Sequence, residues 1–138
     1  MLVKEIMTRG MEFIAPTTTL REAARKMRDL NIGLLPVVEN GKLVGMVTDR
    51  DICCRGVAED LDLMRTEVRE IMSQDVAFCY GYDTVNDAVR QMEQRHIRRL
   101  AVLNNDQSIA GVLSVDDLAH FSRQLAGEVL DTVRPLHH

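Results

Sequence analysis

The stretch GLLPVVENGKLVGMVTDRDI at residues 33–52 decides the fold, because it returns as RRLAVLNNDQSIAGVLSVDDL at residues 98–118 with one residue inserted in the turn. Two further pairs of segments match in the same order, VKEIMT at 3–8 with VREIMS at 68–73 and TLREAARKM at 19–27 with TVNDAVRQM at 84–92. A chain that repeats its pattern in this way is built from two copies of one structural unit.

Each copy predicts the element order β-α-β-β-α. Thr19 and Glu22 form a capping-box pattern that begins a helix, and Asn40-Gly41 is typical of a two-residue hairpin turn. The apolar face of this helix is expected to comprise Leu20, Ala23, Ala24, Met27 and Leu30. In the first copy we expect a helical turn at 3–7, strands at 13–15, 34–38 and 42–48, and a helix from near Asp49. The second copy predicts strands at 77–79, 99–103 and 108–113 and helices at 85–95 and 116–132, and residues 53–67 between the copies also look helical.

The predicted fold class is α/β (α+β), with two β-α-β-β-α repeats packed sheet to sheet about a pseudo-twofold axis. The repeats are assigned to residues 1–62 and 63–138, the second with a C-terminal helix. A unit of roughly 60 residues buries too little surface to be comfortably stable alone. We therefore expect one domain of two halves with a cleft at their junction.

Composition narrows the class of protein. The net charge of −4 argues against nucleic acid as the primary partner, because nucleic-acid binders carry a broad basic face. No apolar run approaches the roughly 18 residues of a membrane span, and the N-terminus is too polar for a signal peptide. We expect a cytoplasmic protein with no membrane association. The three cysteines lack metal-site spacing and are expected to be reduced. The terminal His137 and His138 are given no function.

Two short motifs carry the candidate chemistry, Thr48 with Asp51 and Ser114 with Asp117. A hydroxyl residue followed three positions later by an acid is a helix-capping pattern. The same carboxylate can accept hydrogen bonds from both hydroxyls of a ribose, and the helix N-terminus beside it favours phosphate. Capping and ligand binding are not exclusive, and both interpretations stay open from the residues alone.

The chain resembles a tandem pair of CBS domains, also called a Bateman module. The resemblance runs from Val3 to about Phe121, and rests on EIMT and EIMS, on LLPVV and RRLAV, and on GMVTDRD and GVLSVDD. Ala101 departs from the proline that the family usually has there. The resemblance implies a stand-alone regulatory module, commonly a homodimer, that binds an adenosyl ligand such as AMP, ADP, ATP, NAD(H) or S-adenosylmethionine and reports it to an unidentified regulated protein. No cofactor is implied as obligatory.

The resemblance also implies which residues surround the ligand. By analogy with the family, Thr48 and Asp51 mark one site, and Ser114 and Asp117 mark the other. The base of the first site is expected against Val76, Ala77, Met46 and Ile97, and that of the second against Met11, Glu12 and Val112. As plain core residues, Met46, Ile97 and Val112 need no ligand to explain them.

Cations are expected near the phosphates. Arg98 stands at a position that is often basic in the family, whereas its counterpart Gly33 offers no charge. Arg99 is expected on the opposite face of the strand. Arg50 is assigned to the Asp117 site, and its counterpart Asp116 would repel phosphate at the other. For Arg98, a solvated position at the strand edge stays open as an alternative. His96 is a candidate phosphate contact or pH sensor, and its alternative is plain polar surface.

Catalytic motifs are not recognised in the sequence. It has no P-loop, no HExxH and no nucleophile-base order, so we predict a non-enzyme. The alternative to a ligand sensor is an adaptor or scaffold whose clefts bind nothing.

Overall fold

The computed structural model describes residues 1–133 and separates into two compact units. Unit 1 contains Met1–Met11 and the chain from Ala77 onward, and unit 2 contains Glu12–Val76. The division into repeats at 1–62 and 63–138 stays a prediction, and it differs from the units because each repeat's first segment pairs with the other repeat's sheet. Thr8 bridges to Val112 in unit 1, and Ser73 bridges to Met46 in unit 2.

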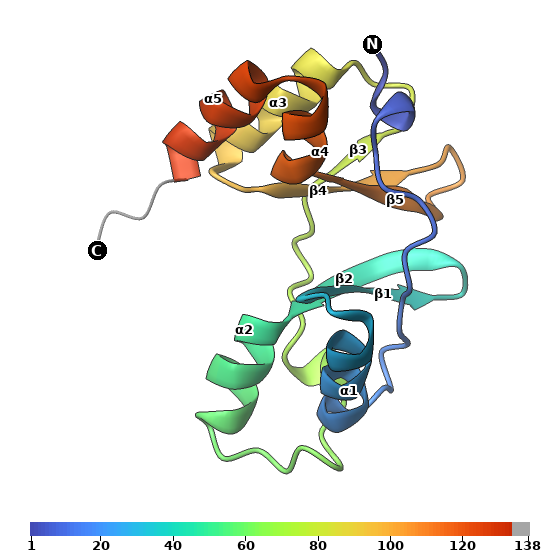
Figure 1. Cartoon of the computed structure of the whole chain (residues 1–138). Helices are drawn as coiled ribbons and strands as arrows, with labels where there is room; N and C mark the ends of the chain where they lie inside the picture. The colour runs from blue at the N-terminus through green and yellow to red at the C-terminus, as the bar shows by residue number, and fades with distance from the viewer. Residues whose placement is uncertain (134–138) are drawn as a thin grey trace. The chain divides into compact units, whose positions relative to one another are not determined.

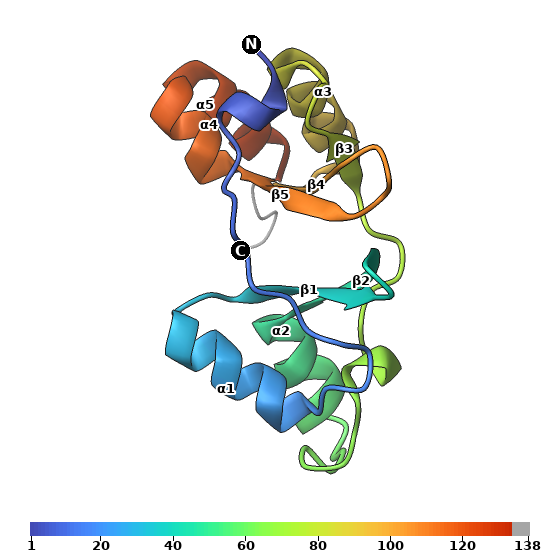
Figure 2. The same ribbon diagram turned by 90° about the vertical axis from the view of Figure 1, so that its right-hand side faces the viewer.

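Unit 2 is a two-stranded antiparallel sheet with helices on one face (Figures 1 and 2). The strands are β1 (Leu34–Glu39) and β2 (Lys42–Thr48), and the helices are α1 (Leu20–Leu30), α2 (Asp49–Asp51), the π-helical η2 (Ile52–Val57) and the 3₁₀ turn η3 (Val68–Glu70). At the β1–β2 turn, Asn40 and Gly41 both have positive φ, 54° and 77°. This is the conformation that an Asn-Gly hairpin turn requires, so the predicted turn is confirmed.

Unit 1 is a three-stranded sheet in the order β3-β4-β5, again with helices on one face (Figures 1 and 2). Its elements are η1 (Val3–Glu5), β3 (Phe78–Tyr80), α3 (Val85–Arg95), β4 (Arg99–Leu103), β5 (Ile109–Ser114), α4 (Val115–Phe121) and α5 (Arg123–Val133). Strand β3 runs parallel to β4, and β5 runs antiparallel to β4. The mixed helix-and-sheet class is confirmed, while the packing of one repeat's sheet on the other stays a prediction.

The duplicated helices begin and end for the same local reasons. The Thr19 hydroxyl accepts a hydrogen bond from the Glu22 N–H, and the Thr84 hydroxyl accepts one from Asp87. Both helices end at a residue in the left-handed region, Asn31 at φ 55° and His96 at φ 56°. Helices commonly end at a residue in the left-handed conformation, so these two residues are explained by the fold without any ligand.

Several predicted elements are wrong in detail. Residues 13–15 form only a single parallel bridge, from Ile14 to Val37, because too few backbone groups pair there to make a strand. The helix predicted over 53–67 ends at Val57. The helix predicted over 116–132 is interrupted at Ser122, whose extended φ of −158° separates α4 from α5. On α1, Ala24 and Leu30 are exposed, because the buried stripe is narrower than the periodicity suggests.

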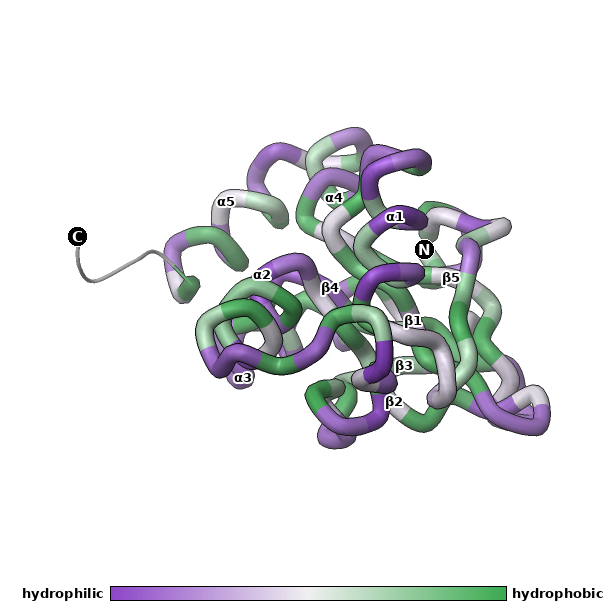
Figure 3. Tube along the Cα trace, turned by 90° about the horizontal axis from the view of Figure 1, so that it is seen from below, coloured by the Kyte–Doolittle hydropathy of each residue, from purple (hydrophilic) through white to green (hydrophobic). Residues whose placement is uncertain are grey.

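Each unit has its own apolar core under its sheet. The largest fully buried side chains include Leu35 in unit 2 and Leu100 and Met92 in unit 1. Hydrophobic and hydrophilic residues alternate along the helices in Figure 3, as the helical period requires when only one side is buried. Over residues 1–133, no helix combines the length and the apolar character that crossing a membrane would take.

The three cysteines are predicted to react at very different rates. Cys79 in β3 is 3% exposed, and burial, assisted by the charge of Asp83, raises the pKa of its thiol to about 12. Cys53 and Cys54 are exposed. Because the thiolate is the reactive form, a thiol reagent at pH 8 should label Cys53 and Cys54 in the folded protein, and label Cys79 only after unfolding. Rapid labelling of Cys79 in the folded protein would contradict its burial.

The same shift makes stability fall in alkali. An unfolded Cys79 would ionise near the ordinary pKa of 9.0, whereas the folded thiol stays neutral up to about 12. The contribution of the neutral Cys79 thiol to the free energy of unfolding is therefore fully present below pH 9, and it is lost as the pH rises from 9 toward about 12. Urea unfolding between pH 8 and 11 should show a smaller decline for Cys79→Ala than for the matched control Cys53→Ala.

Candidate functional site

In unit 2, Thr48 and Asp51 lie where β2 ends and α2 begins. The Asp51 N–H donates to Thr48 Oγ1 at 3.0 Å, and the Thr48 N–H donates to Asp51 Oδ2 at 2.9 Å. Both residues are partly buried. This is a complete capping box, so the capping interpretation is confirmed for this pair.

In unit 1, Ser114 and Asp117 repeat the arrangement at the end of β5. The Asp117 N–H donates to Ser114 Oγ at 3.2 Å, and the Ser114 N–H donates to Asp117 Oδ2 at 2.9 Å. A third residue joins them, because the Thr8 hydroxyl donates to Asp117 Oδ1 at 2.8 Å. Thr8 reaches this position because its backbone pairs in both directions with Val112 of β5. The sequence motifs did not single out Thr8.

The carboxylates of Asp51 and Asp117 therefore differ in how many further hydrogen bonds they can accept from a ligand. Both oxygens of Asp117 accept hydrogen bonds within unit 1. In unit 2, Asp51 Oδ2 is used by the cap, but none of residues 1–133 donates to Asp51 Oδ1. Since a carboxylate oxygen has two lone-pair sites, both acids keep acceptor capacity, and Asp51 keeps more. The capping role leaves room for a ligand hydroxyl.

Two arginines lie beside Ser114. Arg98 and Arg99 line a small hollow of about 130 Å³ together with Ser114 and Asp116. That the Arg99 side chain lies on a different surface from that of Arg98 stays a prediction, because both residues can line the hollow through backbone or side-chain atoms.

The corresponding position in unit 2 has no charge of its own and lies beside a carboxylate. Gly33 is the counterpart of Arg98, and a Cβ at Gly33 would lie 2.8 Å from Asp49 Oδ2. The Asp49 N–H also donates to the Gly33 carbonyl at 3.0 Å. A carboxylate thus fills the space that a side chain would take, and the two repeats present chemically different surroundings to an anionic ligand.

The remaining predicted site residues are distributed over both units. Met46, Val76, Glu12 and Arg50 belong to unit 2, and Ala77, Ile97, Met11 and Val112 belong to unit 1. Ala77 and Ile97 are partly buried against the unit 1 core, and Val112 is 5% exposed, as expected of plain packing residues. Glu12 lies 4.0 Å from the Lys26 ammonium. The assembly of these residues around a ligand stays a prediction.

His96 has a structural explanation. It ends α3 in the left-handed conformation, and its Nδ1 lies 3.0 Å from the Thr132 carbonyl oxygen of α5. Its counterpart Asn31 has the same backbone conformation without an imidazole ring. The ring therefore ties α5 to α3, which the plain-surface alternative did not anticipate.

Asp117 also borders a larger hollow on unit 1. Its volume is about 330 Å³, and its other lining residues include Glu5, His120 and Phe121. Within residues 1–133, no group of three or more His, Cys, Asp or Glu side chains is arranged to hold a metal ion. His137 and His138 lie outside the described residues.

Comparison with known proteins identifies the repeated unit. The family model for the CBS domain matches residues 3–55 and 68–123. The CBS domain-containing protein YhcV of Bacillus subtilis is 37% identical over 133 residues, which cover 95% of this chain and 94% of that protein. Within a longer relative, a homoserine O-acetyltransferase of Methanobrevibacter ruminantium, the match is 32% identical over 86% of this chain and 24% of the enzyme.

Two solved structures add ligands to the comparison. A CBS domain protein of Pyrobaculum aerophilum complexed with AMP matches with a TM-score of 0.79 and 28% identity, covering 95% of this chain and 99% of that one. A CBS domain pair in complex with 5-methylthioadenosine and S-adenosyl-L-methionine matches with a TM-score of 0.76 and 25% identity, covering 88% and 94%. With two matched copies of the domain and a relative similar along nearly its whole length, the chain belongs to the CBS domain family.

Proposed function

We propose that this protein is a non-catalytic regulatory module that binds an adenosine-containing ligand and passes its ligand state to a protein partner. The observation that carries the proposal is the duplicated hydroxyl–carboxylate pair, Thr48 with Asp51 and Ser114 with Asp117. The complexes of related CBS proteins with AMP and with S-adenosyl-L-methionine support it. In the proposed complex, a carboxylate accepts hydrogen bonds from the ribose hydroxyls, and the cleft predicted between the repeats holds the base.

The two sites are proposed to be unequal. Asp51 retains an oxygen that none of residues 1–133 uses as an acceptor, whereas Thr8 already occupies the corresponding oxygen of Asp117. A ribose at the Asp117 site must share or displace the Thr8 hydroxyl. We therefore propose that the Asp51 site binds more tightly. We also propose that the protein forms homodimers, as the resemblance implies, and that it is cytoplasmic, as the polar N-terminus and the lack of a long apolar run suggest.

The second candidate is an adaptor that binds no nucleotide. It is favoured by the capping boxes, which give both aspartates a sufficient structural role without any ligand. The two candidates differ in one measurable property, because only a ligand-binding module is stabilised by an adenosyl compound.

A thermal-shift screen tests the proposal. The protein is heated with AMP, ADP, ATP, NAD, NADH or S-adenosylmethionine, and with CMP as a control that has ribose and phosphate but no adenine. A ligand at a hundred times its Kd should stabilise the folded state by about 2.7 kcal/mol, which is a clear increase in Tm. We expect at least one adenosyl compound to do so and CMP to have a smaller effect. Equal, negligible shifts with all of them would favour the adaptor.

A further inference from the structure

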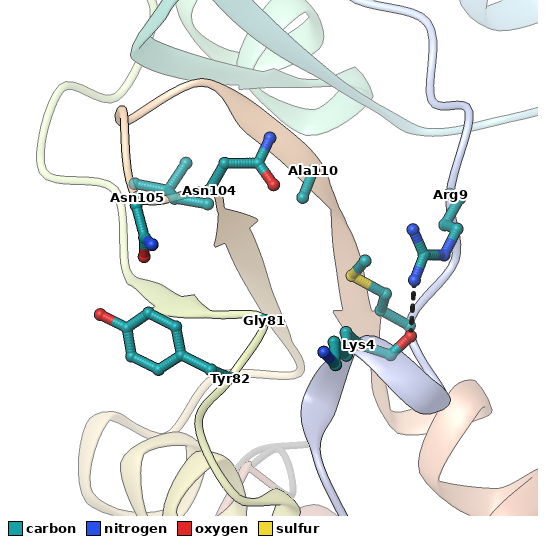
Figure 4. A pocket seen from close by; sticks show the side chains of 9 residues that line it. Lys4, Arg9, Gly81, Tyr82, Asn104, Asn105 and Ala110 are labelled. Atoms are coloured by element: carbon teal, nitrogen blue, oxygen red, sulfur yellow. Dashed lines mark hydrogen bonds between the residues drawn. The ribbon is translucent and has the colours of Figure 1, made fainter.

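A separate pocket on unit 1 is lined by cations and amides. Its volume is about 210 Å³, and Lys4 and Arg9 lie on one side of it with Tyr82, Asn104 and Asn105 on the other (Figure 4). Met7, Gly81, Leu103 and Ala110 complete the lining. We propose that this pocket binds the phosphate group of a small molecule.

The charges of the pocket are available to a ligand. Among residues 1–133, no carboxylate forms an ion pair with Lys4 or Arg9, and no acidic residue lines the pocket. Within residues 1–133, the polar contact of the Arg9 guanidinium is with the Lys4 backbone carbonyl, at 3.0 Å. This contact holds the guanidinium beside the Lys4 side chain and leaves most of its N–H donors free. Two positive charges match the roughly −1.5 to −2 charge of a phosphate monoester at pH 7.

The opposite wall supplies neutral donors and a flat surface. The Asn104 amide donates to Ser108 Oγ at 2.9 Å, which fixes its orientation. Tyr82 stacks on Tyr80, with ring centroids 5.2 Å apart and planes 1° from parallel, so the ring is a supported wall. The pocket is smaller than the roughly 300–1,000 Å³ of drug-sized ligand sites. This size favours a phosphate or pyrophosphate group over a whole nucleotide.

The matching positions of unit 2 carry different charges. Lys4 corresponds to Arg69, whose guanidinium is already paired with Glu67 at 2.7 Å. Asn104 corresponds to Glu39, which would place a carboxylate where the pocket has an amide. Unit 1 therefore differs from its own duplicate in two properties that favour an anion, a cation without an ion-pair partner among residues 1–133 and a lining without an acidic residue.

This pocket is distinct from the Ser114–Asp117 pair. Ala110 lies near the start of β5 and Ser114 at its end, and four residues of strand span about 13 Å. The inference does not rest on the proposed adenosyl function, and either can fail without the other.

The test is an NMR titration of the whole chain in phosphate-free buffer, with sodium pyrophosphate and AMP as separate probes. We expect saturable amide shifts at Lys4, Arg9, Gly81, Tyr82 and Asn104. Shifts with pyrophosphate would indicate a free phosphate compound as the source. Shifts at these amides with AMP alone would indicate the phosphate of a nucleotide, and shifts with neither probe would overturn the proposal.

Two variants and a control locate the binding. Arg9→Gln removes a cation, and Asn104→Glu introduces the carboxylate of the other repeat without removing the Arg9 contact. Each of these two variants should raise the Kd of whichever probe binds, pyrophosphate or AMP, about tenfold or more. The loss of one hydrogen bond to a charged group is enough for a change of that size. Arg25→Gln removes an exposed arginine of unit 2 and should change nothing. Equal losses in all three variants, or wild-type binding by Asn104→Glu, would contradict the assignment.

Discussion

Replacing Asp51 by alanine is expected to weaken AMP binding about tenfold or more while the protein remains folded. A carboxylate that accepts hydrogen bonds from a ribose contributes roughly 1.5–3 kcal/mol, and each 1.4 kcal/mol is a factor of about ten in Kd. The substitution also removes the acceptor for the Thr48 N–H, which costs about 0.5–1.5 kcal/mol of stability as a lost hydrogen bond. Calorimetric titration and urea unfolding measure the two effects separately.

Glu22→Ala provides the matched control. Glu22 has the same place in the capping box of α1, where it accepts from the Thr19 N–H and hydroxyl, but it belongs to no proposed ligand site. Both variants should lose a similar amount of stability, and only Asp51→Ala should lose AMP affinity. If Asp51→Ala binds AMP as tightly as the wild type, its carboxylate is a cap alone, and the adaptor candidate gains support.

The sequence motifs predicted the acid pairs because each pair is local. Thr48 and Asp51 are three residues apart, so the spacing alone predicted a capping box, and the structure confirms it. The partner of Asp117 was not predictable in this way. Thr8 is 109 residues distant in the sequence, and it reaches Asp117 because the N-terminal segment pairs with β5 of the second repeat. The repeat shows which segments correspond, but not with which copy each one packs.

The exact ends of several helices and strands could not be predicted from the sequence for a related reason. The interruption at Ser122 and the reduction of 13–15 to a single bridge depend on tertiary contacts rather than on hydrophobic period. Periodicity predicted that these elements exist, and packing decided where they end.

The docking of the N-terminal segment gives the second large prediction, that Gly111→Ala destabilises the protein. A Cβ at Gly111 would press against the Thr8 backbone carbonyl and lie 3.2 Å from Met7 Sδ. A backbone carbonyl cannot rotate away as a side chain can, so the segment that pairs with Val112 through bonds of 2.9 and 3.0 Å must shift. Overpacking of this kind costs about 1–3 kcal/mol, measurable as a lower urea midpoint.

Gly127→Ala is the control, and its effect should have the opposite sign. Gly127 lies within α5, and a Cβ there meets nothing within 4 Å. Replacing a helical glycine by alanine raises the free energy of unfolding by about 0.5–1 kcal/mol. The unfolded alanine variant has less backbone freedom than the unfolded glycine protein, so folding costs it less conformational entropy. A destabilised Gly127→Ala would mean that α5 is not helical at this position. A neutral Gly111→Ala would mean that Thr8 does not pair with β5, and Asp117 would then keep an oxygen as free as that of Asp51.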